Sequence, residues 1–384
     1  MRTTDLLRDL IAFPTISAES NLALIGYCET ILRDAGAQVT LIRDPSGQKA
    51  NLFATIGPTD RPGVLLSGHT DVVPVAGQDW TVPPFKMTET ADRLFGRGTA
   101  DMKGFVASAL AAAIRAARLD LVTPLHIALS YDEEIGCVGV RSLIAMLAAA
   151  PLRPQFCIVG EPTMMTVATG HKGKTAARLT ATGRESHSAQ APESLNAIHM
   201  ACDMIGVIRD LQAEIATGGG RDSAYDIPYT TLHVGQIAGG IALNIVPNKA
   251  EFVFEIRNLA EDDPQALLAR IRAQADRYLQ EIRKDFPEAD IVIEVTNGYP
   301  PLGTDPDSPV TRLVQSLGRS DTTIKVAFGT EGGLFSTQLG VPTVVCGPGS
   351  MGQGHKPDEY ISLAQLAACD AMLDALLARL AVGL

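Results

Sequence analysis

The chain has 384 residues, of which 46% are hydrophobic and 20% are charged, and its formal net charge is −11. This length exceeds the ~250–300 residues at which a single hydrophobic core stops growing, so at least two domains are expected. The composition excludes a mainly disordered chain, and the absence of a basic tract disfavours nucleic-acid and anionic-membrane partners.

The cysteines and the N-terminal residues indicate where the protein resides. The 6 cysteines are dispersed through the sequence, and none forms a CxxC pair. This spacing is typical of reduced thiols rather than of a disulfide framework. The first residues, MRTTDLLRDLIAF, lack the apolar segment of a signal peptide, and no apolar run approaches the ~20 residues of a transmembrane helix. We therefore expect a cytoplasmic protein.

The first 173 residues alternate between helical and strand-like segments. This alternation predicts a largely parallel α/β sheet that is covered on both faces. The strands are short, continuous apolar runs, as expected for strands buried on both faces. In chain order the predicted elements are helices at 4–11 and 21–35, a strand at 63–67, a helix at 104–118, a strand at 125–130, a helix at 138–149 and a strand at 156–159.

The pattern changes between residues 174 and 296. The predicted elements there are a strand at 174–182, a helix at 195–215, strands at 229–237 and 249–257, a helix at 264–283 and a strand at 289–296. This βαββαβ order is ferredoxin-like. The first pattern resumes afterwards, with a strand at 343–346 and a helix at 363–380. We predict a discontinuous α/β domain, residues 1–173 and 297–384, interrupted by an α+β domain at residues 174–296.

Histidine and acidic side chains gather where the predicted buried strands end. Ligands bind at the carboxyl edge of an open α/β sheet, so these residues are expected to meet there. Each segment alone has an ordinary interpretation, such as a turn, a helix cap or a solvated acidic loop. The residues concerned are His69, Asp71, Asp101, Glu133, Glu134, Glu161 and His355.

Taken together, two histidines and three acids predict a two-metal site. Its predicted ligands are His69, Asp101, Glu134, Glu161 and His355. Nitrogen and carboxylate ligands suit Zn²⁺, with Co²⁺ or Mn²⁺ as alternatives. Each metal is expected to take one His and one Glu, with Asp101 bridging. Glu133 then remains as the general base, and Asp71 as the carboxylate that orients His69.

Five sequence blocks carry a resemblance to a known family. SGHTDVVP, GRGTADMKG, SYDEEIG, VGEPT and GPGSMGQGHKPDEY occur in the order found in the zinc-dependent aminoacylase/carboxypeptidase family, which the chain resembles over nearly its whole length. The resemblance implies a di-metal, aminopeptidase-like catalytic domain with two Zn²⁺ per chain. It also implies an inserted lid domain through which two chains form a homodimer, and a cis peptide between Asp101 and Met102.

The resemblance assigns roles to residues of the inserted domain. His187, in GRESHS, matches a lid histidine that reaches an active site, commonly that of the neighbouring subunit, and stabilises the oxyanion. We expect Asn244 and Arg257 to bind the α-carboxylate of the substrate, because a guanidinium fork suits that anion. Thr330 lies in another block that resembles a substrate-facing loop. Surface roles are the alternative for these residues, and the role of His171 stays open.

The resemblance also indicates a reaction. YDEEIGCVGV, GEPTMM and GQGHKPDEYI are similar to the branch that hydrolyses N²-acetyl-L-ornithine to acetate and L-ornithine in arginine biosynthesis. We therefore expect a metal-dependent amidohydrolase that acts on a small N-acyl amino acid.

Two kinds of alternative remain. Desuccinylation of succinyl-diaminopimelate, or a peptidase or carbamoylase activity, would use the same metal ligands. A non-catalytic binding protein on this fold would be expected to lack a ligand or the base, and none is missing here. Motifs of serine hydrolases (GxSxG) and of zincins (HExxH) are absent from the sequence.

Overall fold

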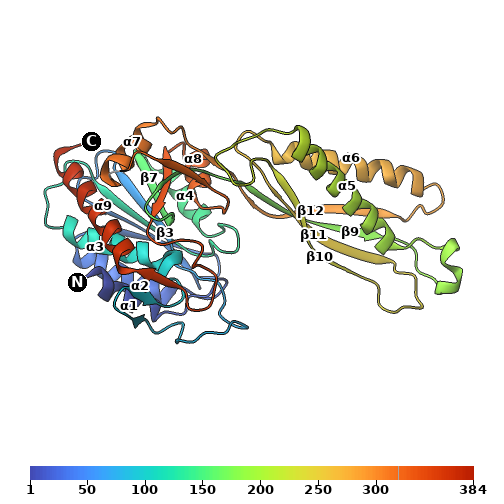
Figure 1. The fold of residues 1–384 in the computed structure, drawn as a ribbon, viewed down its shortest axis with the longest axis horizontal. Coiled ribbons are helices and arrows are strands. Elements are labelled where there is room, and N and C mark those ends of the chain that lie inside the picture. Colours follow the sequence, from blue (N-terminus) through green and yellow to red (C-terminus); the bar gives the residue numbers. More distant parts are fainter. Residues whose placement is uncertain (319) are drawn as a thin grey trace. The chain divides into compact units, whose positions relative to one another are not determined.

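The computed structural model describes residues 1–318 and 320–384 and contains two compact units. The first unit comprises Met1–His171 and Leu302–Leu384, and the second comprises Lys172–Pro301. Each unit has its own cluster of buried hydrophobic side chains. The predicted boundaries, at residues 173/174 and 296/297, lie a few residues inside these limits. Figure 1 shows the elements of both units.

A mixed sheet forms the centre of the first unit. Its strand order is β1-β2-β6-β3-β7-β15-β8-β13, and β14 pairs with β8. The strands are β1 (Gln38–Arg43), β2 (Ala50–Ile56), β3 (Val64–His69), β6 (Leu125–Ser130), β7 (Phe156–Pro162), β8 (Val167–His171), β13 (Leu302–Gly303), β14 (Thr323–Val326) and β15 (Thr343–Gly347). A smaller sheet contains β4 (Thr88–Glu89), β5 (Arg93–Phe95) and β16 (Tyr360–Ser362).

The prediction of a largely parallel sheet is correct for the centre and wrong for the edges. Strands β6, β3, β7 and β15 are parallel to their neighbours in this series. Strand β1 pairs antiparallel with β2, and β2 pairs antiparallel with β6. The few residues between β1 and β2 explain the antiparallel pairing of these two strands, because a parallel pair needs a crossover of a dozen or more residues.

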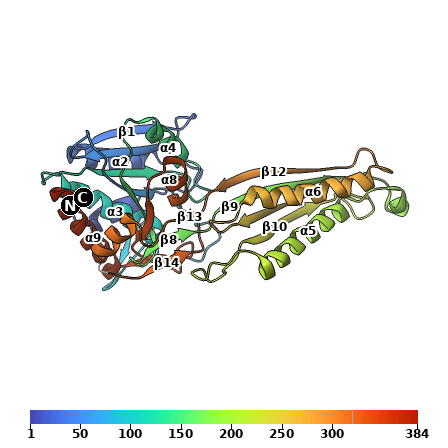
Figure 2. The ribbon, with the colours of Figure 1, turned by 90° about the horizontal axis from the view of Figure 1, so that it is seen from above.

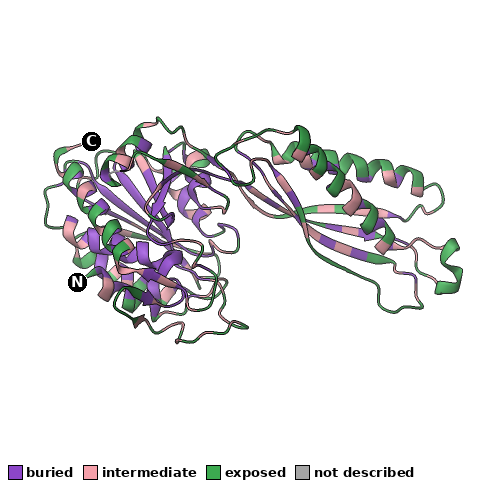
Figure 3. Ribbon diagram, viewed as in Figure 1, coloured by how far each residue is buried: buried purple, intermediate pink, exposed green. Residues whose placement is uncertain are grey.

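Helices cover both faces of this sheet (Figure 1). One face carries α1 (Thr3–Ile11), α2 (Leu22–Asp34), α3 (Gly104–Ala116), α7 (Pro309–Gly318) and α9 (Leu363–Val382), and the other carries α4 (Val140–Ala149) and α8 (Gly332–Leu339). Burial follows these layers, because the central strands are buried along their length whereas the outer helix faces are exposed (Figure 3).

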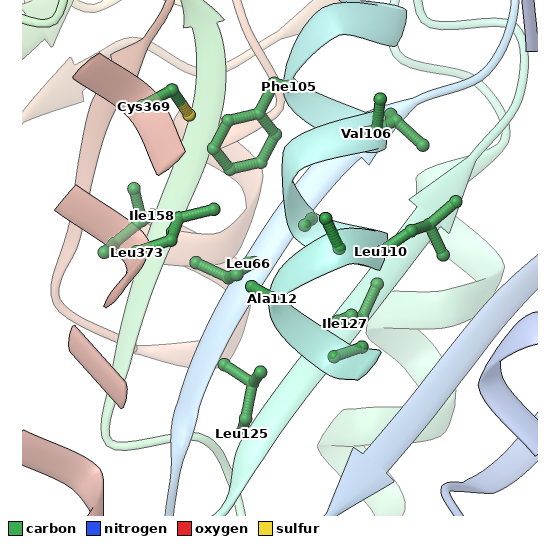
Figure 4. Close-up of a cluster of buried hydrophobic side chains, with 14 of the residues drawn as sticks. Leu66, Phe105, Val106, Leu110, Ala112, Leu125, Ile127, Ile158, Cys369 and Leu373 are labelled. Carbon is green, nitrogen blue, oxygen red and sulfur yellow. The ribbon is translucent and has the colours of Figure 1, made fainter. Parts of the chain in front are cut away.

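Helix α3 is the centre of this packing. It is rich in alanine and almost wholly buried, so helices on either side can approach it closely. Figure 4 shows its Phe105 and Leu110 packed among Leu66 of β3, Ile158 of β7 and Leu373 of α9. The sheet edge that carries the acidic and histidine residues therefore rests on a fully packed core.

The second unit has the predicted βαββαβ order. Its elements are β9 (Lys174–Thr182), α5 (Ala197–Gly218), β10 (Thr231–Gly239), β11 (Lys249–Arg257), α6 (Pro264–Ile282) and β12 (Asp290–Tyr299). The sheet order is β10-β11-β9-β12, and every pair is antiparallel. Helices α5 and α6 lie on one face of it (Figures 1 and 2). The alternation in β11 buries Phe252, Phe254 and Ile256 against these helices.

Local sequence signals set the starts of both long helices of this unit. Asn196 precedes α5, and its side chain accepts hydrogen bonds from the N–H groups of Ile198 and His199. Asp263 precedes α6 and accepts from Gln265, while Pro264 occupies a position that needs no N–H. Among the residues that the structure describes, no helix is long and apolar enough to span a bilayer.

Candidate active site

The acidic and histidine residues of the first unit meet at one edge of its sheet. Strands β3, β6, β7 and β15 run parallel, so their carboxyl ends lie side by side. His69 ends β3, Glu161 lies near the end of β7, and Glu133 and Glu134 follow β6. Asp101 lies just before α3, and His355 lies in the loop after β15. The structure thus brings all five predicted ligands to this edge.

Asp101 lies between the two histidines. Its Oδ1 is 3.1 Å from Nε2 of His69, and its Oδ2 is 3.1 Å from Nε2 of His355. The peptide that joins it to Met102 is cis, as the family resemblance implies. Each oxygen of one carboxylate therefore faces a different imidazole, which is the arrangement expected of a ligand that bridges two cations.

The cluster divides into two halves that share Asp101, and each half contains one histidine and one glutamate. Glu161 Oε1 lies 3.8 Å from Nε2 of His69, and Glu134 Oε2 lies 3.0 Å from Nε2 of His355. Ligand atoms of His69, Glu133 and Glu161 lie within 4.8 Å of one another, and so do those of His69, Asp101 and Glu134. Glu133 thus lies close enough to the first half to act on a group bound there.

Asp71 contacts His69 through its backbone and lies near it with its carboxylate. The ring Nδ1 of His69 lies 2.9 Å from the backbone carbonyl of Asp71 and 3.5 Å from the Oδ1 of its carboxylate. That carboxylate accepts hydrogen bonds from Ser17 Oγ and from the N–H groups of Glu133 and Glu134. The carbonyl of Asp71 is therefore the nearer partner of His69, and the carboxylate lies beside the same ring nitrogen while it also fixes the segment that carries the two glutamates.

The electrostatics of the cluster favour bound positive charge. Burial, with the neighbouring acids, raises the pKa of Glu133 and of Glu161 well above the usual range, and that of Glu134 to about 7. Hydrogen bonds with Asp101 and Glu134 raise the pKa of His355 to about 10. Because buried carboxylates are costly unless they are compensated, this set either takes up protons or binds cations.

The donor set also fits divalent cations chemically. Within residues 1–318 and 320–384, the ion-pair partners of Asp101, Glu134 and Glu161 are the histidines of the cluster. Imidazole nitrogen and carboxylate oxygen are ligands of Zn²⁺ and of similar metals. The residues present therefore fit two cations that share Asp101.

Two further buried side chains, one in contact with the cluster and one near enough to influence Glu133 electrostatically, were not among the predicted site residues. Cys137 is buried, and its Sγ donates to Oε1 of Glu133 at 3.3 Å. Glu331 precedes α8 and is 1% exposed, and burial raises its pKa to about 7. It accepts a hydrogen bond from Ser67 Oγ of β3 at 3.4 Å. Glu331 directly follows the predicted Thr330, whereas Cys137 lies four residues after Glu133, so only Glu331 was adjacent to a predicted site residue.

Thr330 and His171 are interior residues of the first unit. Thr330 is 0% exposed, and its Oγ1 accepts the N–H of Gly332 at the start of α8. His171 is also 0% exposed and accepts the N–H of Gly333 through Nε2 at 3.1 Å. Both side chains therefore fix the beginning of α8 in this structure, and contact of Thr330 with a substrate stays a prediction.

The predicted substrate-binding residues of the second unit fall into two groups. His187 and Asn244 are exposed and lie on neighbouring loops, since Ser188 donates its N–H to the carbonyl of Asn244 at 3.0 Å. Arg257 ends β11, where it donates to Tyr299 Oη at 2.7 Å and to Glu255 at 3.0 Å. The loop of Asn244 adjoins the opposite end of β11, so the structure does not bring Asn244 and Arg257 together within this unit.

Comparison with known families adds one match. The family model described as peptidase family M20/M25/M40 matches residues 65–379. This range contains all five predicted metal ligands, Glu133 and the whole second unit.

Relatives and solved structures agree with that match. The chain is 34% identical over 373 residues to acetylornithine deacetylase of Myxococcus xanthus, covering 96% of this chain and 94% of the relative. It is 34% identical to the acetylornithine deacetylase of Klebsiella pneumoniae, covering 93% and 92%.

Among solved structures, an M20 family metallo-carboxypeptidase from Sulfolobus solfataricus superposes with a TM-score of 0.79 at 19% identity, covering 100% of both chains. A dinuclear metal-binding M20 peptidase from Bacillus subtilis superposes with a TM-score of 0.66 at 14% identity, covering 99% of this chain and 98% of the other. These two likenesses show a shared fold.

Proposed function

The chain belongs to peptidase family M20/M25/M40 and is a hydrolytic enzyme, and we propose that it hydrolyses N²-acetyl-L-ornithine to acetate and L-ornithine. The observation that carries amide hydrolysis is the cluster in which Asp101 lies between two His–Glu halves with Glu133 beside it. The names of relatives that are 34% identical over nearly the whole chain support the substrate.

We assign the cation ligands from this geometry. His69 and Glu161 would hold one cation, His355 and Glu134 a second, and Asp101 both. Zn²⁺ is the proposed metal, with Co²⁺ or Mn²⁺ as substitutes. When bound, such cations polarise an amide carbonyl and lower the pKa of a coordinated water.

Glu133 is the proposed general base and acid. Its carboxylate lies beside the His69 half, and Cys137 and the Asp71 carboxylate hold its segment in place. It would accept a proton from the attacking water and then deliver that proton to the leaving amine of ornithine. Asp71 acts through the positions of Glu133 and His69 and does not touch the substrate.

The second unit would supply substrate contacts as a lid. His187 is exposed, and the resemblance assigns it to the oxyanion that forms when the amide carbonyl is attacked. Asn244 and Arg257 would bind the α-carboxylate of the substrate. Closure of such a unit would also exclude bulk water from the reaction.

The length of β11 bears on how these contacts assemble. The strand runs from Lys249 to Arg257, which is about 26 Å at the ~3.3 Å rise of a strand. One substrate carboxylate cannot touch residues at both ends of it. We therefore propose a homodimer through the second unit, in which one chain supplies Arg257 and the other supplies Asn244 with His187.

Acetate release from N²-acetyl-L-ornithine tests the proposal. The metal-stripped chain is assayed before and after addition of Zn²⁺ or Co²⁺, and we expect activity only with metal. Release of the free amino group, which hydrolysis of every one of these amides produces, is then measured for N²-acetyl-L-ornithine, N-succinyl-diaminopimelate and dipeptides, and their kcat/KM values are compared. A higher kcat/KM for a succinyl or peptide substrate would overturn the assignment of substrate, and absence of any amide hydrolysis by the metal-loaded chain would overturn the proposed activity.

A further inference from the structure

The two segments that carry Asp101 and His355 have irregular backbones. Asp101 lies in Thr99–Lys103 with non-helical angles (φ −123°, ψ 93°), and His355 has a φ of 61°. A non-glycine residue in the left-handed region is uncommon and needs support from its surroundings. The regular hydrogen bonds of a helix or a strand therefore do not fix the separation of these two ligands.

The carboxylate of Glu359 binds the backbone of the segment that contains Asp101. Its Oε1 accepts the N–H groups of Ala100 at 2.9 Å and of Asp101 at 3.1 Å. Its Oε2 accepts the N–H of Gly98 at 3.0 Å and Nη1 of Arg97 at 2.7 Å. Arg97 and Glu359 are each 1% exposed. Burial of this ion pair would be costly without these hydrogen bonds. Both carboxylate oxygens of Glu359 are used as acceptors, whereas Nε of Arg97 is buried without a partner among the residues that the structure describes.

Gln78 connects the same network to His355. Arg97 donates through Nη2 to Oε1 of Gln78, and Trp80 donates its indole N–H to the same oxygen at 3.1 Å. The Nε2 of Gln78 then donates to the backbone carbonyl of His355 at 2.9 Å. A continuous chain of hydrogen bonds therefore runs from the amide of Asp101 through Glu359, Arg97 and Gln78 to the carbonyl of His355.

We propose that Glu359, Arg97 and Gln78 are positioning residues that fix the separation of Asp101 and His355 and thereby set the cation affinity of the half formed by Asp101, Glu134 and His355. This inference rests on the proposed function. The other half needs the network less, because His69 ends strand β3 and is held by the carbonyl of Asp71. His355 is 45% exposed and follows a long loop, so it depends on contacts from outside its own segment.

Gln78→Leu is the selective test. It removes the contact with His355, while Arg97 keeps its bonds to Glu359 and to the carbonyl of Lys356. The probe is Co²⁺ alone, titrated calorimetrically into the metal-stripped chain. We expect two binding classes in the wild type. Gln78→Leu should weaken one of them by about 10–100-fold, the usual effect of losing a partner that orients a ligand, and leave the other unchanged.

Two further variants identify the affected class. His355→Ala removes a ligand of the same half, so it should abolish the class that Gln78→Leu weakens. Arg153→Leu is the matched control, because it removes a hydrogen bond from a side chain to the carbonyl of Leu339 elsewhere in the first unit. Its two Co²⁺ classes and its activity should equal those of the wild type.

Glu359→Gln tests the other end of the network. The amide places an NH₂ group against N–H donors that a carboxylate oxygen accepted, so the Asp101 segment should shift. Because Asp101 belongs to both halves, we expect both Co²⁺ classes to weaken. The thermal unfolding midpoint of each metal-stripped variant shows whether that variant is folded. If Glu359→Gln does not fold, Gln78→Leu alone tests the inference.

The outcomes separate this inference from the proposed function. A wild-type chain that binds fewer than two Co²⁺ ions overturns the proposed function and this inference with it. Two wild-type classes that stay unchanged in Gln78→Leu overturn the inference alone. Equal weakening of both classes in Gln78→Leu, together with a lower unfolding midpoint, also overturns it, because the network would then serve general stability.

Discussion

The acid–histidine cluster of the first unit is mostly buried, whereas His187 and Asn244 of the second unit are exposed. His69 is 1% exposed and Glu161 is 3% exposed, and their polar atoms face one another. His187 and Asn244 are exposed loop residues: the ring of His187 accepts the N–H of Ala189, and the carbonyl of Asn244 accepts the N–H of Ser188. Buried ionisable groups are costly, so their clustering is itself evidence of a site, whereas exposed residues give no such evidence.

Of the substitutions that test this difference, Glu133→Gln should lower kcat the most. The amide cannot accept a proton, so kcat should fall by about 10²–10⁴-fold, the usual contribution of a general base. Metal content, measured by elemental analysis, should stay at the wild-type value. Glu288→Gln is the control, because Glu288 is an exposed residue of the second unit that pairs with Arg184. Retained activity in Glu133→Gln would contradict its assignment.

His187→Ala tests whether the exposed residues act in catalysis. Loss of one donor to the oxyanion should lower kcat by about 10²–10³-fold. Metal content and the unfolding midpoint should not change, since His187 is exposed. His199→Ala, on the exposed face of α5, is the matched control and should keep full activity. Equal kcat in both variants would show that His187 is only a surface residue.

Arg257→Lys should have a smaller effect, mainly on KM. Lysine keeps the charge but loses the two-pronged geometry that suits a carboxylate. A hydrogen bond to a charged group contributes about 1.5–3 kcal/mol, so KM should rise by about tenfold or more. Arg178→Lys, on the neighbouring strand β9, is the control. A large fall in kcat at unchanged KM would argue against a role in binding the carboxylate.

His126 has the smallest expected effect, because it is a buried histidine that forms no ion pair with an acid among the residues that the structure describes. It lies in β6, contacts Thr55 Oγ1 through Nδ1 at 2.9 Å and stacks on Phe53. Burial lowers its pKa to about 4, whereas the acids around His355 raise the pKa there. The unfolded state therefore binds more protons than the folded state between about pH 6.5 and pH 4.

This lowered pKa predicts that the folded state becomes less stable as the pH falls. The contribution of neutral His126 is complete above about pH 6.5 and is lost as the pH falls toward 4, by about 1 kcal/mol at pH 5.5. Urea unfolding of the metal-stripped wild type and of His126→Gln, at pH 7.5 and 5.5, measures it. The wild type should lose more stability than the variant between the two values. Equal losses of unfolding free energy in the wild type and in His126→Gln would show that burial of His126 does not cause the pH dependence.

Much of the fold follows from hydrophobic patterns. The continuous apolar runs at β3, β6 and β7 and the alternation in β11 predicted those strands, because such patterns reflect burial on two faces or on one. The strands that were not predicted are β1, β2, β4, β5, β8, β13, β14 and β16. Strands β8 and β14 pair with each other across more than 150 residues of sequence. Strands β1 and β14 are only partly buried, so the local sequence carries little signal for them.

The site could be predicted as a set of residues but not as a network. Side chains that follow buried strands meet at one edge, so the ligands were accessible to sequence reasoning. The partners of those ligands were not. Gln78 lies in an irregular loop, and its contact with His355 spans 277 residues of sequence. Likewise, the choice between the carbonyl and the carboxylate of Asp71 depends on Ser17 and on the Glu133 amide.

The length of β11 carries a consequence for how the enzyme would behave in solution. If Asn244 of one chain and Arg257 of another hold the same carboxylate, a complete site contains residues of two molecules. Specific activity would then fall on dilution, at chain concentrations near the dissociation constant of the dimer. Mixed dimers of an Asn244→Ala chain and an Arg257→Ala chain would regain activity, since one of their two sites would keep both residues.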